Sequence, residues 1–242
     1  MLTELAADAV ARLDAAFAEA ARPDRAPAMA AYLRNRYAFL GIAAPERVVA
    51  CRAAWADLPA PEPDDVEALV RALWARDARE HQYAALWFLQ RHEHRLPSTF
   101  LPVARDLITT KSWWDTVDPL AVHVVGDLVR ADRRLAAVMD RWIDDDDIWL
   151  ARTAILHQNA WKTDTDADRL FRYCLRRAGD TEFFIRKAIG WALRERSKVD
   201  ADGVRRFVAD HADELSGLSR REAVRWLDRR AARTEGRRLA SA

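Results

Sequence analysis

"FFIRKAIGWALRE", residues 183–195, contains one copy of a repeat that decides the fold. Its segment "RKAIG" (186–190) shares a basic residue, one variable position, alanine and a β-branched residue with "RTAIL" (152–156) and "REAVR" (221–225). The copies are 34 and 35 residues apart, and steps of 35 and 70 residues back from Arg152 reach Val117 and "QYAAL" (82–86). Helical hairpins repeat at this spacing, and they must stack because one hairpin cannot bury its apolar face alone.

The rest of the chain also indicates helices. Glycine is scarce, with 7 residues, and apolar side chains recur at helical spacing, as in Leu69, Val70, Leu73 and Trp74. All nine prolines lie at or before Pro119, so the second half should run as uninterrupted helices. We predict an all-α fold of about twelve or thirteen helices, a HEAT-like α-solenoid of stacked helical hairpins with a concave basic groove. It should form a single HEAT-like repeat domain over residues 1–242, with a basic, flexible tail after about residue 232.

Composition limits the class of protein. No stretch approaches the roughly 18 apolar residues of a membrane span, so we expect no membrane partner. Cys51 and Cys174 are isolated in the sequence, which fits a reducing compartment and a cytoplasmic location. The net charge is only +1, but residues 171–198 hold eight Arg and Lys against three Asp and Glu. Such a segment suits nucleic acid, although charge alone favours arginines scattered over solvated helix faces.

A second pattern concerns side chains that the repeat would bring together. The predicted helix from about Glu182 to Arg196 carries one apolar stripe and one stripe of cations around a tryptophan. The apolar stripe is Ile185, Ala188, Ile189 and Ala192, and the other is Lys187, Trp191, Arg194 and Lys198. In "SWWDTVD" (112–118), Trp114 and Asp118 are four residues apart and share a helix face. Arg152 should lie between these two helices at its repeat position, which gives a constellation of Trp114, Asp118, Arg152, Trp191 and Arg194.

These residue types suit one kind of chemistry. A lone carboxylate among aromatic faces can stabilise a planar cation, such as the oxocarbenium ion of a sugar. The sequence has no serine–histidine nucleophile motif and no glycine-rich phosphate loop, and we expect no cofactor. His92 and His94 have the wrong spacing to bind a metal from one helix face, so we expect no metal. His123 fits a satisfied core histidine, whereas His157 could reach the concave wall.

Five segments then carry a resemblance to a family. "MAAYLRNRYAFLGIAAPERV" (29–48), "SWWDTVD", "IWLARTAIL" (148–156), "FFIRKAIGWALRE" and "LSRREAVRWL" (218–227) resemble, in order, segments of AlkD-type DNA glycosylases, the HEAT-like DNA alkylation repair family. The resemblance runs from about residue 3 to residue 232. It implies an enzyme that hydrolyses the N-glycosidic bond of cationic N3- and N7-alkylated purines in duplex DNA, without a base-flipping pocket. The implied partner is double-stranded DNA containing alkylated bases, and we expect a monomer.

The resemblance also implies roles for individual residues. Asp118 corresponds to the catalytic aspartate, and Trp114 and Trp191 to the tryptophans that pack against the deoxyribose of the lesion. Arg152 and Arg194 correspond to arginines that contact DNA. Trp113 should pack inward, and Asp115 should lie near a helix start. The other DNA contacts that we expect are Lys187, Tyr32, Arg47 and Lys111.

One departure from the family leaves more than one function open. Ala43, Ala44 and Val48 stand where polar and basic residues are common, which should weaken the grip on the strand opposite the lesion. A looser grip could also admit bulky natural-product adducts. A HEAT-like DNA-binding protein without catalysis and a protein–protein scaffold are two further possibilities. A glycosylase should bind duplex DNA with an affinity that falls steeply with salt, whereas a scaffold should be indifferent to salt.

Overall fold

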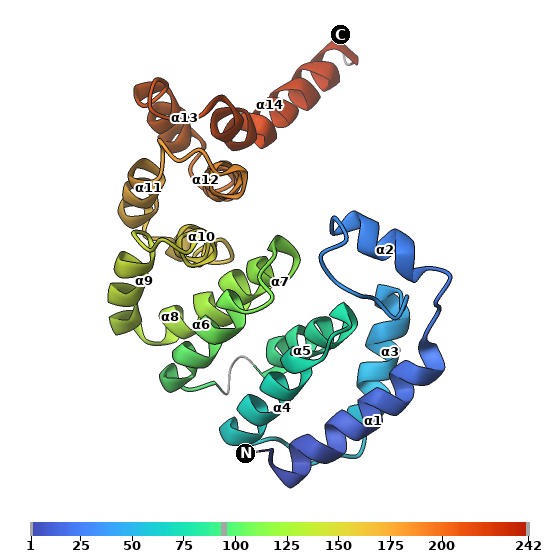
Figure 1. The fold of residues 1–242 in the computed structure, drawn as a ribbon. Coiled ribbons are helices and arrows are strands. Elements are labelled where there is room, and N and C mark those ends of the chain that lie inside the picture. The colour runs from blue at the N-terminus through green and yellow to red at the C-terminus, as the bar shows by residue number, and fades with distance from the viewer. Residues whose placement is uncertain (1, 93–95, 241–242) are drawn as a thin grey trace. The chain divides into compact units, whose positions relative to one another are not determined.

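The computed structural model describes residues 2–92 and 96–240 and consists of helices and their connections (Figure 1). Within these residues no strand forms, and Ala38 and Ala78 make an isolated parallel bridge. The chain divides into two compact units, Met1–Thr110 and Lys111–Ala242. The predicted all-α solenoid is confirmed. The expected single repeat domain depends on how the units join, and it stays a prediction.

The first unit contains the helices before residue 111. In chain order they are α1 (Glu4–Ala20), α2 (Ala26–Tyr32), α3 (Ala44–Trp55), α4 (Pro63–Ala75), α5 (Arg79–His92), the 3-10 turn η2 (Ser98–Phe100) and α6 (Leu101–Thr109). Prolines stand in the first turn of α2, α3, α4 and α6, where a missing N–H costs no hydrogen bond. These four prolines therefore mark helix starts.

The second unit holds the repeats. Its helices are α7 (Trp114–Pro119), η3 (Leu120–Val125), α8 (Gly126–Ala131), η4 (Arg133–Leu135), α9 (Ala136–Trp142), α10 (Ile148–Leu156), η5 (Lys162–Asp164), α11 (Ala167–Arg176), α12 (Phe183–Ser197), α13 (Ala201–Asp210) and α14 (Gly217–Ala240). In Figure 1, α10, α12 and the start of α14 form one row of this unit, and α9, α11 and α13 form the other. The three copies of the repeat motif lie on α10, α12 and α14, so they belong to one row.

Aspartates and one glycine explain how these helices begin and pack. Asp147, Asp166 and Asp200 each cap a helix by accepting a hydrogen bond from a backbone N–H of the first turn. The predicted apolar stripe of α12 is buried, with its four side chains at most 1% exposed. Gly190 lets α14 approach α12 closely, because an added Cβ would lie 2.5 Å from the Cβ of Glu222. The packing of α12 on α14 therefore depends on a residue without a side chain.

The helix that opens the second unit changes its winding midway. Pro119 has no N–H to continue the α-helical pattern. After it, η3 is a π-helix, and Gly126 donates to the carbonyl of Ala121, five residues earlier. Asp118 directly precedes Pro119 and so lies where the winding changes. Single π turns occur often at functional sites.

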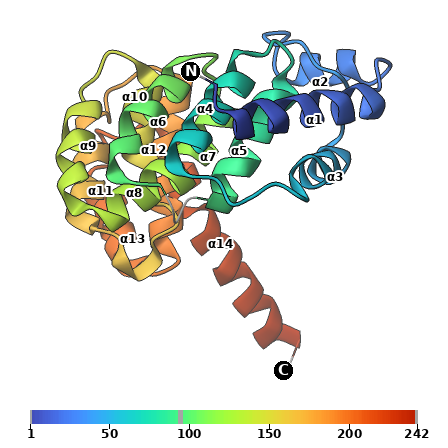
Figure 2. The ribbon, with the colours of Figure 1, turned by 90° about the horizontal axis from the view of Figure 1, so that it is seen from below.

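The last helix, α14, extends past residue 232, where we expected a flexible tail. Its backbone is helical to Ala240 and continues away from α12 and α13 (Figure 2). The flexibility of this segment stays a prediction. None of the described helices combines the length and the apolar character that crossing a membrane requires.

Candidate active site

The most distinctive side-chain contact in the second unit joins Asp118 to Arg152. Arg152 on α10 donates two hydrogen bonds to Asp118, one from Nε to Oδ1 at 2.7 Å and one from Nη2 to Oδ2 at 2.8 Å. Its Nη1 donates to the carbonyl oxygen of Phe184, in the first turn of α12. One arginine thus connects α7, α10 and α12. The Arg152 side chain is 5% exposed, whereas that of Asp118 keeps 16% of its surface accessible.

Burial changes the acidity of this carboxylate. It raises the pKa of Asp118 above its ordinary value, although the bidentate hydrogen bond and the charge of Arg152 act in the opposite direction. The nearby Asp115 adds a smaller upward contribution. Asp118 is therefore a better proton acceptor than a solvated aspartate, and its orientation is fixed by a planar, bidentate partner.

A cavity of about 300 Å³ opens beside this pair. It lies wholly within the second unit, and its lining combines aromatic rings, cations and two carboxylates. The lining residues are Trp114, Asp118, Arg152, Phe183, Phe184, Lys187, Trp191, Arg194 and Glu222. The structure thus brings together all five members of the predicted constellation, with Lys187 beside them.

An aromatic cluster supports the carboxylate side of the cavity. Trp113 is 5% exposed, as predicted for an inward-packing residue, and its ring packs edge-on against Phe184 with centroids 4.8 Å apart. Trp149 completes the cluster, 5.0 Å from Phe184 and 5.7 Å from Trp113. Phe183 packs against Phe184 but remains 53% exposed. The sequence prediction missed both phenylalanines, although their adjacent positions at the start of a predicted helix were visible.

The opposite side of the cavity carries a second carboxylate that the sequence prediction also missed. Glu222 on α14 lies 3.0 Å from Nζ of Lys187 and 2.5 Å from Nη1 of Arg194, both on α12. Arg225 approaches the same carboxylate at 3.5 Å. Burial acts to raise the pKa of Glu222, but the bonds and charges of Lys187 and Arg194 outweigh it, and the pKa is lowered. Two of the predicted DNA-binding cations, Lys187 and Arg194, therefore share one carboxylate of the protein itself.

The structure gives Arg152 an internal role, and its predicted DNA contact stays a prediction. The resemblance implies a DNA contact, but its side chain is buried and its three guanidinium nitrogens already donate to Asp118 and to the backbone. This geometry fits a residue that positions Asp118.

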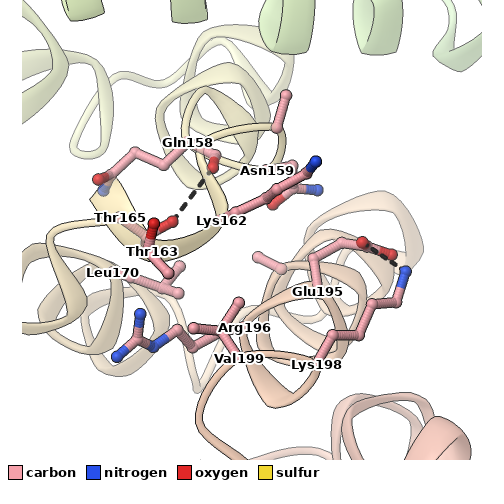
Figure 3. A pocket seen from close by; sticks show the side chains of 12 residues that line it. Gln158, Asn159, Lys162, Thr163, Thr165, Leu170, Glu195, Arg196, Lys198 and Val199 are labelled. Atoms are coloured by element: carbon pink, nitrogen blue, oxygen red, sulfur yellow. Dashed lines mark hydrogen bonds and ion pairs between the residues drawn. The ribbon is translucent and has the colours of Figure 1, made fainter.

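Lys198, predicted on the same stripe as Trp191, lies elsewhere. It pairs with Glu195 at 2.6 Å and lines a larger cavity of about 530 Å³ (Figure 3). Gln158 and Thr165 line it from the neighbouring repeat, where Figure 3 marks the hydrogen bond between them. None of the predicted site residues lines this cavity, so its size does not make it the candidate active site.

Two histidines differ from their predicted environments. His123 is exposed on η3, because the winding after Pro119 turns it to the surface while Val122 and Val124 are buried. His157, which by its position in the sequence could reach the concave wall, is 1% exposed, and its Nδ1 lies 2.7 Å from the carbonyl oxygen of Ala154. Burial lowers the pKa of His157 to about 4.

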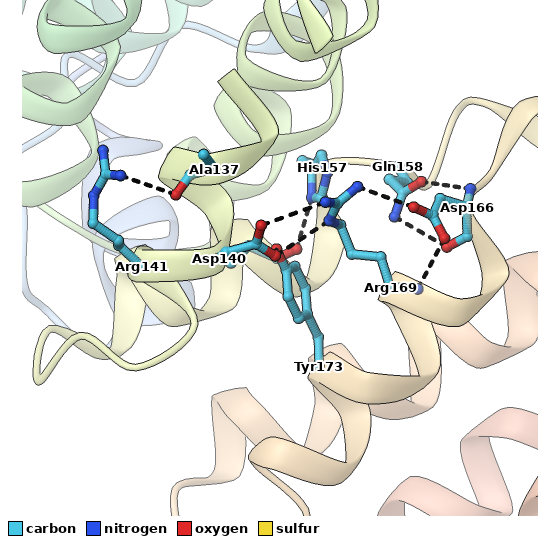
Figure 4. Close-up of polar contacts among 9 residues, drawn as sticks. Ala137, Asp140, Arg141, His157, Gln158, Asp166, Arg169 and Tyr173 are labelled. Carbon is cyan, nitrogen blue, oxygen red and sulfur yellow. Dashed lines mark hydrogen bonds and ion pairs between the residues drawn. The ribbon is translucent and has the colours of Figure 1, made fainter. Parts of the chain in front are cut away.

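The surroundings of His157 form a separate polar cluster (Figure 4). Tyr173 donates its hydroxyl to Asp140 at 2.6 Å, and Arg169 lies 3.3 Å from the same carboxylate. Burial acts to raise the pKa of Asp140, but these two partners outweigh it and the pKa is lowered. The cluster joins α9 to α11 and contains none of the predicted site residues, so its position indicates a structural role.

Three predicted DNA contacts are not among the residues that line the cavity. Tyr32 ends α2 and is 73% exposed, and the guanidinium of Arg47 on α3 lies 4.5 Å from the ring centre of Tyr83. Lys111 has a left-handed backbone with φ 52° just before α7. Tyr32 and Arg47 belong to the first unit and Lys111 to the second. Their DNA contacts stay predictions.

The substituted positions Ala43, Ala44 and Val48 also lie in the first unit, at the start of α3. Their effect on DNA binding likewise stays a prediction. Within residues 2–92 and 96–240, no group of three or more His, Cys, Asp or Glu side chains is placed to hold a metal ion. His94 lies outside the described residues.

Comparisons with known proteins bear on the same region. A search of curated proteins finds no match. A solved structure described as a predicted DNA alkylation repair enzyme from Enterococcus faecalis is 26% identical, with a TM-score of 0.78 over 86% of this chain and 96% of that chain. The family model described as DNA alkylation repair enzyme matches residues 13–227, which include every residue that lines the candidate site. The chain therefore belongs to the DNA alkylation repair enzyme family.

Proposed function

We propose that this protein is a DNA glycosylase that hydrolyses the N-glycosidic bond of cationic N3- and N7-alkylated purines in duplex DNA. The observation that carries the proposal is the partly accessible carboxylate of Asp118, held by Arg152 in a cavity lined by two tryptophans and further cations. Membership of the DNA alkylation repair family supports a role in repair of alkylated DNA. The specific reaction is the one that the resemblance implies, and the chemistry of the cavity supports it.

An alkylated purine already carries the positive charge that makes it a good leaving group. The enzyme therefore needs no strong general acid, and stabilising the sugar cation becomes its main task. The carboxylate of Asp118 supplies an attractive charge in a partly desolvated site, where electrostatic interactions are stronger than in water. The bidentate bond to Arg152 holds that charge in one place, so little reorganisation is needed during the reaction.

The reaction balances without a cofactor. The bond between C1′ and the purine nitrogen breaks, and its electron pair stays on the purine, whose positive charge it neutralises. The oxygen of a water molecule then bonds to C1′, and Asp118 positions this water and accepts its proton. The raised pKa of Asp118 favours that acceptance. The products are the free base and an abasic site.

The remaining cavity residues suit the binding of the DNA backbone. Trp114 and Trp191 offer ring faces that attract a cationic sugar. Lys187 and Arg194 carry the charges that phosphate groups need. This arrangement grips the sugar and its phosphates, so the damaged base can leave without entering a pocket. We propose that a monomer acts on the duplex.

The test is base release from a duplex that carries a single 7-methylguanine, compared with the same duplex without the lesion. We expect the wild-type protein to release free 7-methylguanine and to leave an intact strand with an abasic site. Binding to the undamaged duplex should weaken steeply with salt, because phosphate contacts release counterions. Salt-dependent binding without base release would favour the catalytically inactive DNA-binding protein. A protein that binds no duplex at any salt concentration would favour the protein–protein scaffold.

A further inference from the structure

Glu222 occupies an unusual position for a carboxylate in a site that we propose for DNA. It lines the cavity, its side chain is only 13% exposed, and it lies within 3.0 Å of both Lys187 and Arg194. Arg225 contributes a third, more exposed cation at 3.5 Å. A carboxylate among several donors resembles a phosphate group in both charge and acceptor geometry.

The backbone fixes Glu222 in this place. Gly190 allows α12 and α14 to approach so closely that any side chain there would meet the Cβ of Glu222. Ser219, one turn before Glu222, donates its hydroxyl to the carbonyl of Arg186 at 2.9 Å, which adds a second tie between the helices. The carboxylate therefore cannot leave the cations by a simple movement of the helix, and a phosphate must compete with it.

We infer that Glu222 is an internal substitute for a DNA phosphate, which sets the affinity of the cavity for DNA by competing for Lys187 and Arg194. The inference rests on the proposed function, since it assumes that these cations bind phosphates. Competition lowers the affinity for any duplex, because each phosphate contact must first replace a contact to Glu222. The lowered pKa of Glu222 keeps the competitor ionised at neutral pH.

A purely structural role for Glu222 predicts the opposite result. If the carboxylate only orients Lys187 and Arg194 for DNA, its neutralisation should loosen both cations and weaken binding. If it competes with phosphate, neutralisation should free both cations and strengthen binding. Glu222→Gln separates the two roles, because the amide has almost the same shape and keeps an acceptor oxygen.

The experiment measures the dissociation constant for an undamaged duplex as salt is raised, for wild type and Glu222→Gln. Each cation that contacts a phosphate only in the variant should add about 0.9 to the steepness of the log–log salt dependence. Two freed cations would then make the variant lose about tenfold more affinity than wild type between about 50 and 200 mM salt. At the low-salt end, Glu222→Gln should bind the duplex more tightly than wild type.

Glu195→Gln is the matched control. Glu195 also pairs with a lysine, Lys198 at the end of α12, but it lines the other cavity. This variant changes the net charge by the same amount, and its affinity and salt dependence should follow wild type. If Glu222→Gln and Glu195→Gln strengthen DNA binding equally, the change in net charge explains the effect. The inference that Glu222 competes with phosphate is then overturned.

A second comparison tests whether Glu222 acts through the two cations. Glu222→Gln should have no further effect on binding when Lys187 and Arg194 are both changed to glutamine, because residues that act through one contact are not additive. An undiminished effect in that background would overturn the inference.

Base release from the duplex with 7-methylguanine is measured in parallel, so that the two proposals can fail separately. If the wild-type protein releases the base but Glu222→Gln binds the duplex no more tightly than wild type, only the inference about Glu222 is overturned. A wild-type protein that binds no duplex would overturn both.

Discussion

Two carboxylates line the same cavity, and they differ in almost every other respect. Asp118 has one arginine partner, Arg152, and its pKa is raised because burial outweighs that partner. Glu222 bonds to Lys187 and Arg194, and its pKa is lowered because these cations outweigh burial. The balance between burial and the neighbouring cations therefore decides the direction of each pKa shift. It also separates a group able to accept a proton from a group that remains a fixed counter-charge.

The first way to break this comparison is to remove one arginine from each side. Arg152→Gln leaves the buried Asp118 without its cation, and we expect the free energy of unfolding to fall by about 3 kcal/mol or more. Arg194→Gln leaves Glu222 paired with Lys187, and Arg194 is itself more exposed than Arg152, so the loss should be about 1 kcal/mol or less. Urea unfolding of both variants measures the difference. Equal losses would show that the two pairs do not differ in this way.

Acid pH offers a second test of the comparison, because it should protonate Asp118. Loss of the fold at low pH must first be separated from that protonation. His157 has an ordinary pKa of 6.5 when unfolded but about 4 when buried, so protons favour the unfolded chain between these values. Stability should fall by about 3 kcal/mol as the pH drops from 6.5 toward about 4. His157→Phe should flatten this fall, judged by the pH dependence of urea unfolding.

The control for this test is His211→Gln. His211 lies near the surface of the same unit, with 29% of its side chain exposed. This variant should keep the wild-type pH dependence. If His157→Phe also keeps it, another group causes the acid instability.

A smaller effect should come from the tryptophans that line the cavity together with the two carboxylates. Trp191→Leu removes a ring face from the cavity but leaves both ion pairs, and we expect base release to slow by about tenfold, or roughly 1.4 kcal/mol. Trp226→Leu is the control, because Trp226 lies on α14 outside the cavity lining. Single-turnover rates of the two variants check the difference. Equal slowing would assign the loss to general destabilisation.

The repeat in the sequence predicts more of this site than the individual motifs do. Asp118 and Arg152 are 34 residues apart, and the repeat spacing alone predicts that they lie on neighbouring helices. Lys187 and Glu222 are 35 residues apart and meet by the same rule. The sequence prediction missed this second pair because several arginines surround Glu222 and make its segment resemble a basic helix.

Other features could not be read from periodicity. The π-helix after Pro119 turns His123 outward, and helical spacing assumes constant winding. The burial of Arg152 depends on the carbonyl of Phe184, because a backbone acceptor has no signature in the sequence. Residue spacing thus predicted which side chains meet, whereas the role of each cation depended on how many acceptors surround it.

The central claim is that the carboxylate of Asp118 drives base release, and one measurement tests it most directly. Single-turnover release of 7-methylguanine from a duplex is compared for wild type, Asp118→Asn and Asp115→Asn, with DNA affinity measured beside it. Asp118→Asn should slow release by about a hundredfold or more, or roughly 3–4 kcal/mol, because it removes one electrostatic stabiliser of the transition state. Its DNA affinity should be largely kept, and Asp115→Asn, which does not line the cavity, should follow wild type. Release by Asp118→Asn at the wild-type rate would contradict the account.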